Sequence, residues 1–423
     1  MEERISDEFK SFLDSGIYRL DGSKVVFVDP VRLLNDSYSR FRISPSSYYS
    51  RSFQSTDRRR VVEEVNVPSI SKKKRKRKKT PRDLNEREKS AEKRHQQEAR
   101  SLLLKAHRAF LEAAELQTFL PKLVKCVEFS RGGETEEKNF IELGSCWQAP
   151  LYEIGLCFPK SNEGEDSWLA NHVGRTVVPL FNNLISHETN DEVEAEFNNS
   201  QYILPGRSCF YMSDLRQIRN LIPAKSDQGF NLIVIDPPWE NGSARQKAAY
   251  PTLPNRYFLY LPVKELAHAE GALVALWMTN REKLHMFVEK DLFPAWGVTN
   301  VTLCYWLKVK PDGSLIGELD LFHHRPYEYL LLGYINMENI DSECMPAVNL
   351  EDARVIISIP GVHSRKPALG KLLWDHIPGN KPVKCIELFA RELMAGWTSW
   401  GNEPLHFQDS RYFVEKDKKD GLR

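Results

Sequence analysis

Beyond about residue 200, short apolar runs alternate with segments whose apolar residues recur at helical spacing. The predicted strands are Leu232–Ile235, Ala272–Met278, Val301–Val309, Tyr327–Tyr334, Arg354–Ile359 and Lys384–Phe389. The predicted helices between them include Val263–Ala269, Arg281–Leu292 and Lys366–His376. This alternation predicts an α/β domain whose mostly parallel sheet is covered by helices on both faces. Ligands of such sheets bind outside the carboxyl ends of the strands.

The first 200 residues follow other patterns. Residues 16–28 predict a small hairpin around an Asp-Gly turn, which could pack on a later domain. Residues 35–60 are rich in Ser, Arg and Tyr and have little to bury, so we expect disorder there, with RNA stacking as the alternative.

A helical stripe appears in the second hundred residues. Leu103, His107, Phe110 and Ala114 follow helical spacing after a charged stretch, and His107 is expected to pack against neighbours. We expect a mostly flexible N-terminal region, a helix with a small accessory domain, the α/β domain and a C-terminal tail, over residues 1–82, 83–200, 201–410 and 411–423.

The formal net charge of +1 hides a strongly basic run at residues 72–79. Without its eight positive charges the chain carries 1 − 8 = −7, and residues 201–410 carry 21 Lys and Arg against 23 Asp and Glu, a net of −2. Such a run predicts nuclear import, with a merely solvated charge run as the alternative. A nucleic-acid contact by the α/β domain would need a local basic patch.

Other compositional features narrow the class of protein. The start of the chain lacks the layout of a secretory signal and no apolar stretch has membrane-spanning length, so we expect a protein of the cell interior, in the nucleus. The seven cysteines are scattered without a Cys-x-x-Cys pair. This spacing favours buried free thiols over a metal site or a disulfide framework.

The candidate chemistry centres on Asp236-Pro237-Pro238-Trp239, directly after the predicted strand Leu232–Ile235. Two prolines cannot donate to a strand ladder, so the strand must end there, with the Asp236 carboxylate at its tip. A carboxylate, carbonyls on restricted backbone and a flat aromatic group suit a planar ligand that carries an amino group. A simple strand cap is the alternative for Asp236.

This motif matches the signature of methyltransferases that act on exocyclic amino groups of nucleobases. Over roughly residues 205–407 the chain resembles the eukaryotic N6-adenosine methyltransferase family, most closely its methyltransferase-like protein 4 branch. The further matches are Lys366-Pro367, the run from Ile386 to Arg391, Trp397 or Trp400, and Gly401-Asn402. The resemblance implies a Rossmann-like fold, S-adenosylmethionine as cofactor, and a permuted motif order.

The resemblance also implies a role for each residue. Asp236 and the Pro237 carbonyl would accept the two N–H bonds of adenine N6, while Trp239 would wall or stack the base. Lys366 matches the lysine that neutralises the methionyl carboxylate. The other expected cofactor residues are Asp236 itself, Arg391 and Asn402 near the ribose, Glu403 where the best-known members carry Gln, and Ser213 and Asp214 near the cofactor adenine.

Four residues are candidates for substrate contact: Tyr250, Lys308, Arg325 and Glu328. Arg325 follows two histidines that could contact phosphate, and a plain surface turn is the alternative. Tyr250 could gate the substrate or be an ordinary loop residue. Trp397 and Trp400 are expected in the core.

Three functions follow from these features. The leading one is N6-adenine methylation of RNA, for which the branch implies 2′-O-methyladenosine in small nuclear RNA. The alternatives are N6-adenine methylation of DNA and an inactive subunit that only binds RNA. We expect a monomer, with the N-terminal 200 residues replacing a partner, although a heterodimer stays open.

Overall fold

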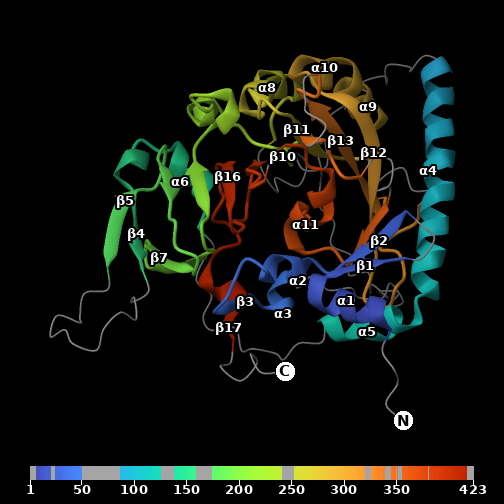
Figure 1. Cartoon of the computed structure of the whole chain (residues 1–423), viewed down its shortest axis with the longest axis horizontal. Coiled ribbons are helices and arrows are strands. Elements are labelled where there is room, and N and C mark those ends of the chain that lie inside the picture. Colours follow the sequence, from blue (N-terminus) through green and yellow to red (C-terminus); the bar gives the residue numbers. More distant parts are fainter. Residues whose placement is uncertain are drawn as a thin grey trace, which may run out of the picture.

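A mixed sheet, with 11 strands among the described residues, forms the centre of the molecule (Figure 1). The computed structural model describes residues 6–20, 24–49, 86–124, 138–158, 174–240, 252–319, 325–338, 344–348, 350, 355–379 and 381–416. The basic run at residues 72–79 and Tyr250 lie outside the described residues, as does the histidine pair before Arg325.

The order of the main sheet is β1-β2-β14-β12-β13-β11-β10-β15-β16-β9-β6. These strands are β1 Ile17–Arg19, β2 Val25–Val28, β6 Leu184–Ser186, β9 Cys209–Met212, β10 Leu232–Ile235, β11 Ala272–Met278, β12 Thr299–Lys308, β13 Tyr327–Ile335, β14 Val355–Ser358, β15 Cys385–Leu388 and β16 Trp397–Gly401. The run β11-β10-β15-β16-β9 is parallel, whereas β13 is antiparallel to both of its neighbours. The sheet is therefore mixed and mostly parallel.

The six predicted strands are all present. β10 and β11 match their predicted bounds, because each is an uninterrupted apolar run buried on both faces. β9 and β16 were missed: β16, Trp-Thr-Ser-Trp-Gly, mixes polar and apolar residues and has no apolar run.

Helices cover both faces of the sheet, as expected. α8 Val263–Leu266, α9 Glu282–Phe287, a π-helical turn and α10 Phe293–Trp296 pack on one face, where Ile233 and Ile235 point. α2 Pro30–Asn35 and α11 Gly370–Leu373 pack on the face that carries Leu232 and Val234. This two-residue alternation within β10 divides the core into two layers. No helix among the described residues is long and apolar enough to cross a membrane.

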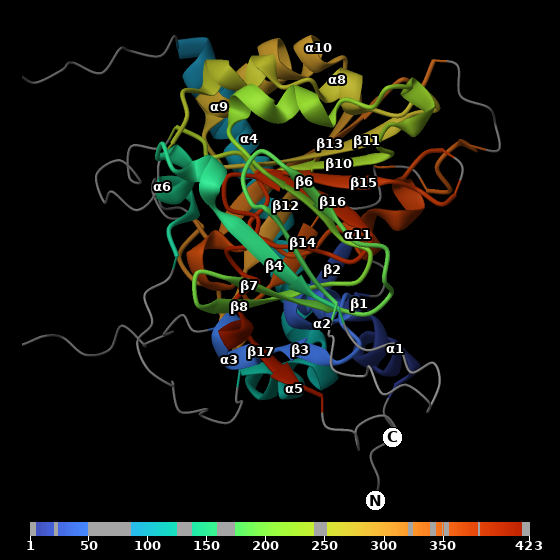
Figure 2. The same cartoon turned by 90° about the vertical axis from the view of Figure 1, so that its left-hand side faces the viewer.

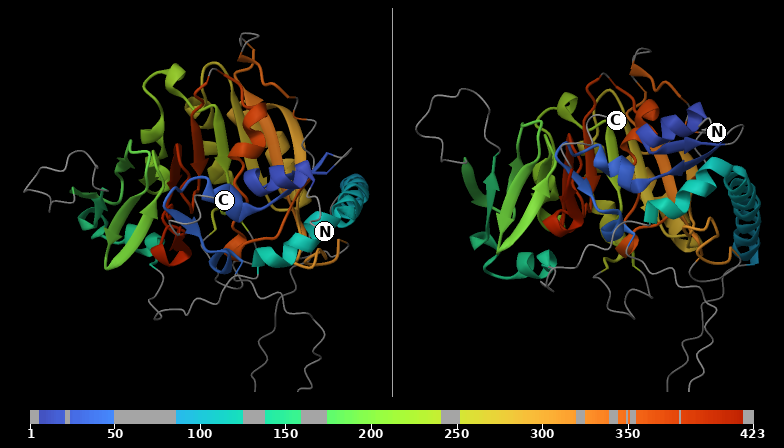
Figure 3. Two further views of the ribbon diagram at one scale, coloured as in Figure 1. Left: turned by 60° about the horizontal axis from the view of Figure 1, so that its bottom comes forward. Right: turned by 90° about the horizontal axis from the view of Figure 1, so that it is seen from below.

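The long helix α4 Glu86–Glu112 runs along one end of the sheet, and α5 Ala114–Val124 follows it (Figures 1 and 3). Leu103 and Phe110 are fully buried on the predicted stripe. His107 Nε2 lies 2.9 Å from the Gly313 carbonyl oxygen, so it is packed, as predicted.

The N-terminal region differs from the expectation of a mostly flexible segment over residues 1–82. α1 Asp7–Ser15 precedes the predicted hairpin, whose strand β2 pairs with β14 in the main sheet. β3 Phe41–Ile43 pairs with β17 Phe413–Glu415, and α3 Pro45–Tyr48 follows β3. Disorder was therefore the wrong prediction for residues 35–49, where buried aromatic side chains outweigh the low-complexity composition.

A second, antiparallel sheet, of four strands in the part of the chain that the structure describes, lies at the end opposite α4 (Figures 2 and 3). Its order is β5-β4-β7-β8, with β4 Glu153–Cys157, β5 Arg175–Pro179, β7 Val193–Phe197 and β8 Ser200–Leu204. α6 Phe140–Ser145 precedes it. The strand β6 pairs with β9 of the main sheet, although it lies before the domain boundary predicted at residue 201.

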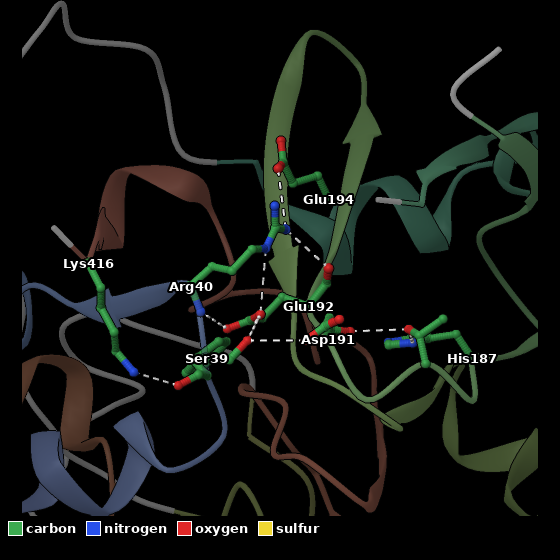
Figure 4. Close-up of polar contacts among 9 residues, drawn as sticks. Ser39, Arg40, His187, Asp191, Glu192, Glu194 and Lys416 are labelled. Carbon is green, nitrogen blue, oxygen red and sulfur yellow. Dashed lines mark hydrogen bonds and ion pairs between the residues drawn. The ribbon is translucent and has the colours of Figure 1, made fainter. Parts of the chain in front are cut away.

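A buried carboxylate ties the second sheet to the N-terminal segment (Figure 4). Glu192, only 1% exposed, accepts hydrogen bonds from the Ser39 hydroxyl at 2.7 Å and the Arg40 backbone N–H at 2.8 Å. Lys416 donates to the Tyr38 carbonyl at 2.7 Å from the C-terminal side. Three segments distant in sequence are thus joined by charge-assisted hydrogen bonds.

Candidate active site

Asp236 lies at the carboxyl end of β10, the strand between the parallel strands β11 and β15. Its backbone N–H donates to the Leu388 carbonyl at 3.3 Å. The Trp239 backbone N–H donates to the Pro237 carbonyl at 2.7 Å, and its indole donates to the Trp277 carbonyl at 2.8 Å. These bonds hold the four-residue motif in one conformation, and the second lone pair of the Pro237 carbonyl stays available.

Lys366 lies between two carboxylates. Its Nζ is 3.2 Å from Asp236 Oδ2 and 3.3 Å from Glu328 Oε2. Glu328, on β13, also accepts a hydrogen bond from Lys308 on β12. Four charged side chains from three strands and one loop therefore meet beside the strand tip.

Electrostatics fix the charge of this cluster. Burial raises the pKa of Glu328, but the ammonium groups of Lys308 and Lys366 outweigh burial and lower that pKa to about 2. Burial lowers the pKa of Lys366, whereas Asp236 and Glu328 raise it, with a net rise above the ordinary value. Lys366 and Glu328 are both charged at neutral pH.

A cavity opens over the strand tip and gathers most of the predicted site residues. Asp236, Pro237, Pro238, Trp239, Glu328, Lys366, Arg391, Asn402 and Glu403 all line it. Trp239 is 5% exposed and packs edge-on against Phe258, with ring centroids 4.9 Å apart, so it forms a wall of the cavity. Trp397 and Trp400 are buried in the core, as expected.

Ser213 and Asp214 do not line this cavity, although they follow the carboxyl end of β9. The Ser213 hydroxyl accepts a hydrogen bond from the Trp400 indole at 2.9 Å. Asp214 caps the next helical turn and pairs with Arg216, whose hydrogen bonds lower the pKa of that carboxyl. Their assignment to the cofactor adenine stays a prediction.

Lys308 and Arg325 also lie outside the cavity lining. Lys308 is 8% exposed and holds Glu328, so the structure gives it a positioning contact. Arg325 donates to the Asn280 carbonyl at 3.5 Å and to the Tyr327 hydroxyl at 3.4 Å. Of the three candidates for substrate contact that the structure describes, Lys308, Arg325 and Glu328, the last reaches the cavity wall.

Several lining residues were missed by sequence reasoning: Ile141, Met278, Thr279, Ser364 and Phe389. Met278 ends β11 and Thr279 follows it, so the rule that sites form at carboxyl strand ends could have found both. Phe389 adopts φ 63°, a left-handed conformation that is unusual for a bulky residue. Ile141 comes from α6, which no local signal connects to the site.

A buried ion pair beneath the cavity was also missed. Arg365 is 2% exposed and donates from Nε to Glu392 Oε2 at 2.9 Å and from Nη2 to Glu392 Oε1. Its guanidinium carbon lies 4.7 Å from the Tyr48 ring centroid and 4.3 Å from that of Phe407. Because Arg365 precedes Lys366 and Glu392 follows Arg391, this pair positions two residues of the cavity.

Comparison with known proteins agrees with this geometry. The model of the MT-A70 family matches residues 230–403, which contain every lining residue except Ile141. The mouse N(6)-adenine-specific methyltransferase METTL4 is 34% identical over 326 residues, which cover 74% of this chain and 66% of the mouse protein. The chain belongs to the MT-A70 family.

The names of two further relatives state different substrates, RNA for one and DNA for the other. The N6-methyladenosine RNA methyltransferase MTA1 of Cryphonectria parasitica is 37% identical over 195 residues, covering 44% of this chain and 55% of the relative. The DNA N6-methyl methyltransferase of Caenorhabditis elegans is 32% identical over 222 residues, covering 51% and 57%. The chain thus spans between about half and just under two thirds of each of these three relatives.

The donor set of this MT-A70 cavity is chemically suited to S-adenosylmethionine. Lys366 and Arg391 are cations for a methionyl carboxylate, and Asp236 is an acceptor for an ammonium group. Glu403 and Asn402 offer acceptors for a ribose diol. Five of the cofactor residues that the resemblance implies therefore line one cavity, whereas Ser213 and Asp214 do not.

Gly401 lies so close to the loop around Ala390 that a side chain at this position would displace that loop, which carries Arg391 of the cavity. A Cβ on Gly401 would lie 2.9 Å from the Ala390 carbonyl oxygen and 3.1 Å from its nitrogen. We expect Gly401→Ala to shift the loop that carries Arg391 and to weaken S-adenosylmethionine binding about tenfold or more, ~1.4 kcal/mol, measured by calorimetric titration. Gly174→Ala is the matched control, because no atom lies within 4 Å of its Cβ. Unchanged affinity of the first variant would contradict this packing argument.

Glu387 makes stability depend on pH. It lies on β15 opposite Val234 and lines a second pocket, which shares Lys366 and Arg391 with the cavity described above. Burial first, and then Glu392 and Asp236, raise its pKa from 4.5 to about 8. The folded protein therefore binds more protons than the unfolded chain between these two values, and stability falls as pH rises through that window.

The prediction is that Glu387→Gln reduces this loss. In urea unfolding at pH 5 and pH 8, the wild type should lose more stability between the two conditions than the variant, because the glutamine stays neutral. Glu153→Gln, at an exposed position, should behave like the wild type. A wild-type loss no larger than that of Glu387→Gln would refute the raised pKa.

Proposed function

We propose that this protein is an S-adenosylmethionine-dependent N6-adenine methyltransferase that acts on RNA. The observation that carries the proposal is the strand-tip Asp236, which shares one cavity with Pro237, Lys366, Arg391 and Asn402. A base amino group docked at the tip would lie beside the residues suited to the cofactor. Family membership supports the same reaction, since the mouse relative is named an N(6)-adenine-specific methyltransferase.

The residues of the chain would orient the amino group. Its nitrogen is a poor nucleophile because the lone pair is delocalised into the ring. Asp236 and the Pro237 carbonyl would accept its two N–H bonds, which aims the lone pair and raises its electron density. The cofactor, when bound, supplies an electrophilic methyl group on a sulfonium. After the transfer, the methylated nitrogen is strongly acidic and releases its proton to water. Asp236 therefore acts as an orienting acceptor, and the reaction requires no dedicated general base.

We propose that the permuted order of the methyltransferase motifs also holds for this chain. For the substrate we propose 2′-O-methyladenosine in small nuclear RNA. Support for RNA comes from the name of the Cryphonectria parasitica relative, and the 2′-O-methyl group rests on the resemblance to the methyltransferase-like protein 4 branch. The test is methyl transfer to matched oligonucleotides that carry ribose, 2′-O-methylribose or deoxyribose at one adenosine. The 2′-O-methyl strand should be fastest, and equal rates on all three would overturn the substrate assignment.

A DNA substrate is the second candidate, favoured by the name of the Caenorhabditis elegans relative. The deoxyribose strand of the same assay tests it directly. An inactive RNA-binding subunit is disfavoured because Asp236, Lys366, Arg391 and Asn402 are all present and converge. Failure of the folded protein to bind S-adenosylmethionine in a calorimeter would favour that inactive reading.

We further propose a nuclear, monomeric protein. The basic run at residues 72–79 supports nuclear import, and deletion of that run should move a fluorescent fusion out of the nucleus. The second sheet and the N-terminal segment pack on the main sheet within one chain, which supports a monomer. Sedimentation that shows an obligate heterodimer would contradict it.

A further inference from the structure

An exposed aromatic surface lies directly beside the catalytic loop. The short helix η4, Asn255–Tyr260, turns Phe258 into the core, whereas Tyr257 is 40% exposed and Tyr260 is 70% exposed. Leu259 is also exposed, so three large apolar side chains of this six-residue helix face outward. The Arg256 guanidinium carbon lies 5.5 Å from the Tyr257 ring centroid.

The helix is held rigidly against the Asp236 motif. Phe258 packs edge-on against Trp239 at 4.9 Å and against Phe389 at 5.8 Å, and both partners line the catalytic cavity. The Trp296 indole donates to the Phe258 carbonyl at 3.1 Å. Asn255 Oδ1 accepts from the Glu240 backbone N–H at 3.2 Å, and the Leu253 N–H donates to the Pro238 carbonyl at 3.0 Å. The tyrosines are therefore fixed relative to the cavity.

We propose that η4 is a stacking platform for unpaired nucleotides that flank the target adenine. The inference rests on the proposed function for the identity of the target. Exposed tyrosines and an arginine combine the aromatic faces and the cation that bind single-stranded nucleic acid, and base stacking does not depend on sequence. A base pair in a duplex keeps its faces within its own stack, so such a platform selects unpaired strands.

The side chains of the platform, and not the net charge of the region, favour nucleotides over a protein partner. Residues 201–410 carry a net charge of −2, so a general electrostatic field does not supply the attraction. The Arg256 cation lies over the Tyr257 ring, Tyr260 is exposed on the same short helix, and Phe258 of that helix packs on Trp239 in the cavity wall. Stacking beside a flipped or unpaired target gives affinity without a broad basic surface.

The test uses the full chain and a fluorescein-labelled RNA of about 12 nucleotides, within the usual site size, either unpaired or annealed to its complement. The wild type should bind the unpaired strand at least tenfold more tightly by fluorescence anisotropy. Tyr257→Ala and Tyr260→Ala should each weaken that binding by about fivefold or more, the lower end of the cost of losing one stacked base. Tyr257→Phe and Tyr260→Phe should keep it, because the rings remain.

Matched controls separate this platform from other roles. Trp374→Ala removes a remote aromatic residue that is 41% exposed and should leave RNA binding unchanged. S-adenosylmethionine affinity should be equal in the wild type and both alanine variants, which shows that the cavity is intact. Unchanged RNA affinity in both alanine variants would overturn the platform. A slower sedimentation of the alanine variants than of the wild type would also overturn it, because it would show that the tyrosines bind a second protein molecule.

The binding assay also distinguishes the two proposals. If the wild type transfers no methyl group to any strand, the proposed function fails, whereas selective loss of unpaired-strand binding in the tyrosine variants still supports the platform. If the wild type is active and the tyrosine variants match its KM on unpaired strands, the platform fails and the proposed function stands.

Discussion

Asp236→Ala should lower methyl transfer by about 10²- to 10³-fold, the usual cost of removing one preorganised electrostatic partner. The carboxylate is the acceptor at the tip of β10 that would hold the base amino group. Its loss removes orientation and electron donation at the reacting nitrogen, so the effect should fall on kcat. RNA binding should change little, because the flanking contacts remain. Transfer of a labelled methyl group, with RNA affinity measured in parallel, checks both expectations.

Two comparisons make this result specific. Lys366 keeps its contact with Glu328 at 3.3 Å when Asp236 is removed, so the charge cluster retains one acceptor and the fold should survive. Asp227→Ala, an exposed carboxylate away from the cavity, should match the wild type. Turnover by Asp236→Ala equal to that of the control would remove the motif from the mechanism.

Arg365→Met should destabilise the protein by about 3–5 kcal/mol, because it leaves the Glu392 carboxylate, whose side chain is 12% exposed, without its partner. The guanidinium is 2% exposed and lies between the rings of Tyr48 and Phe407. Its loss therefore affects the N-terminal segment as well as the cavity loops. Urea unfolding followed by tryptophan fluorescence measures the change in the free energy of unfolding.

The matched control is Lys371→Ala, which breaks a half-exposed ion pair with Asp36 at the surface. That pair should contribute between about 0 and 1 kcal/mol. The double variant Arg365→Met/Glu392→Met should recover part of the loss, since it removes the unpaired buried charge. Similar losses for Arg365→Met and Lys371→Ala would show that Arg365 is not an essential buried partner.

Local sequence was sufficient to predict the strands and helices whose hydrophobic pattern does not depend on distant residues. β10 and β11 are continuous apolar runs of four and seven residues, and that length favours a strand buried on both faces of a sheet over a helix. The α4 stripe was equally readable, because Leu103 and Phe110 repeat with the helical period. Residues 35–49 were misread since their aromatic side chains are buried by distant segments: Tyr38 packs on Phe413 and Tyr48 lies against Arg365.

Some residues of the candidate site could likewise be predicted from the sequence, and others could not. Asp236 was located by two prolines that end a strand, and Glu403 and Arg391 by their motif neighbours. The contacts of Lys366 with Asp236 and Glu328 join residues far apart in the chain, and sequence spacing gives no distance between such residues. Arg365, Glu392 and Ile141 have no local signal, because their importance lies in what packs against them.

The sequence by itself located the Asp236 carboxylate at the carboxyl end of a strand, since two prolines cannot continue the ladder of the apolar run before them. It also determined the alternation of strands and helices, which depends on local periodicity. Only the tertiary structure decided that the N-terminal strands join the main sheet, that Lys366 lies between two acids, and that η4 presents two tyrosines beside Trp239. Those features depend on long-range burial and charge pairing, which exist only after distant segments of the chain meet.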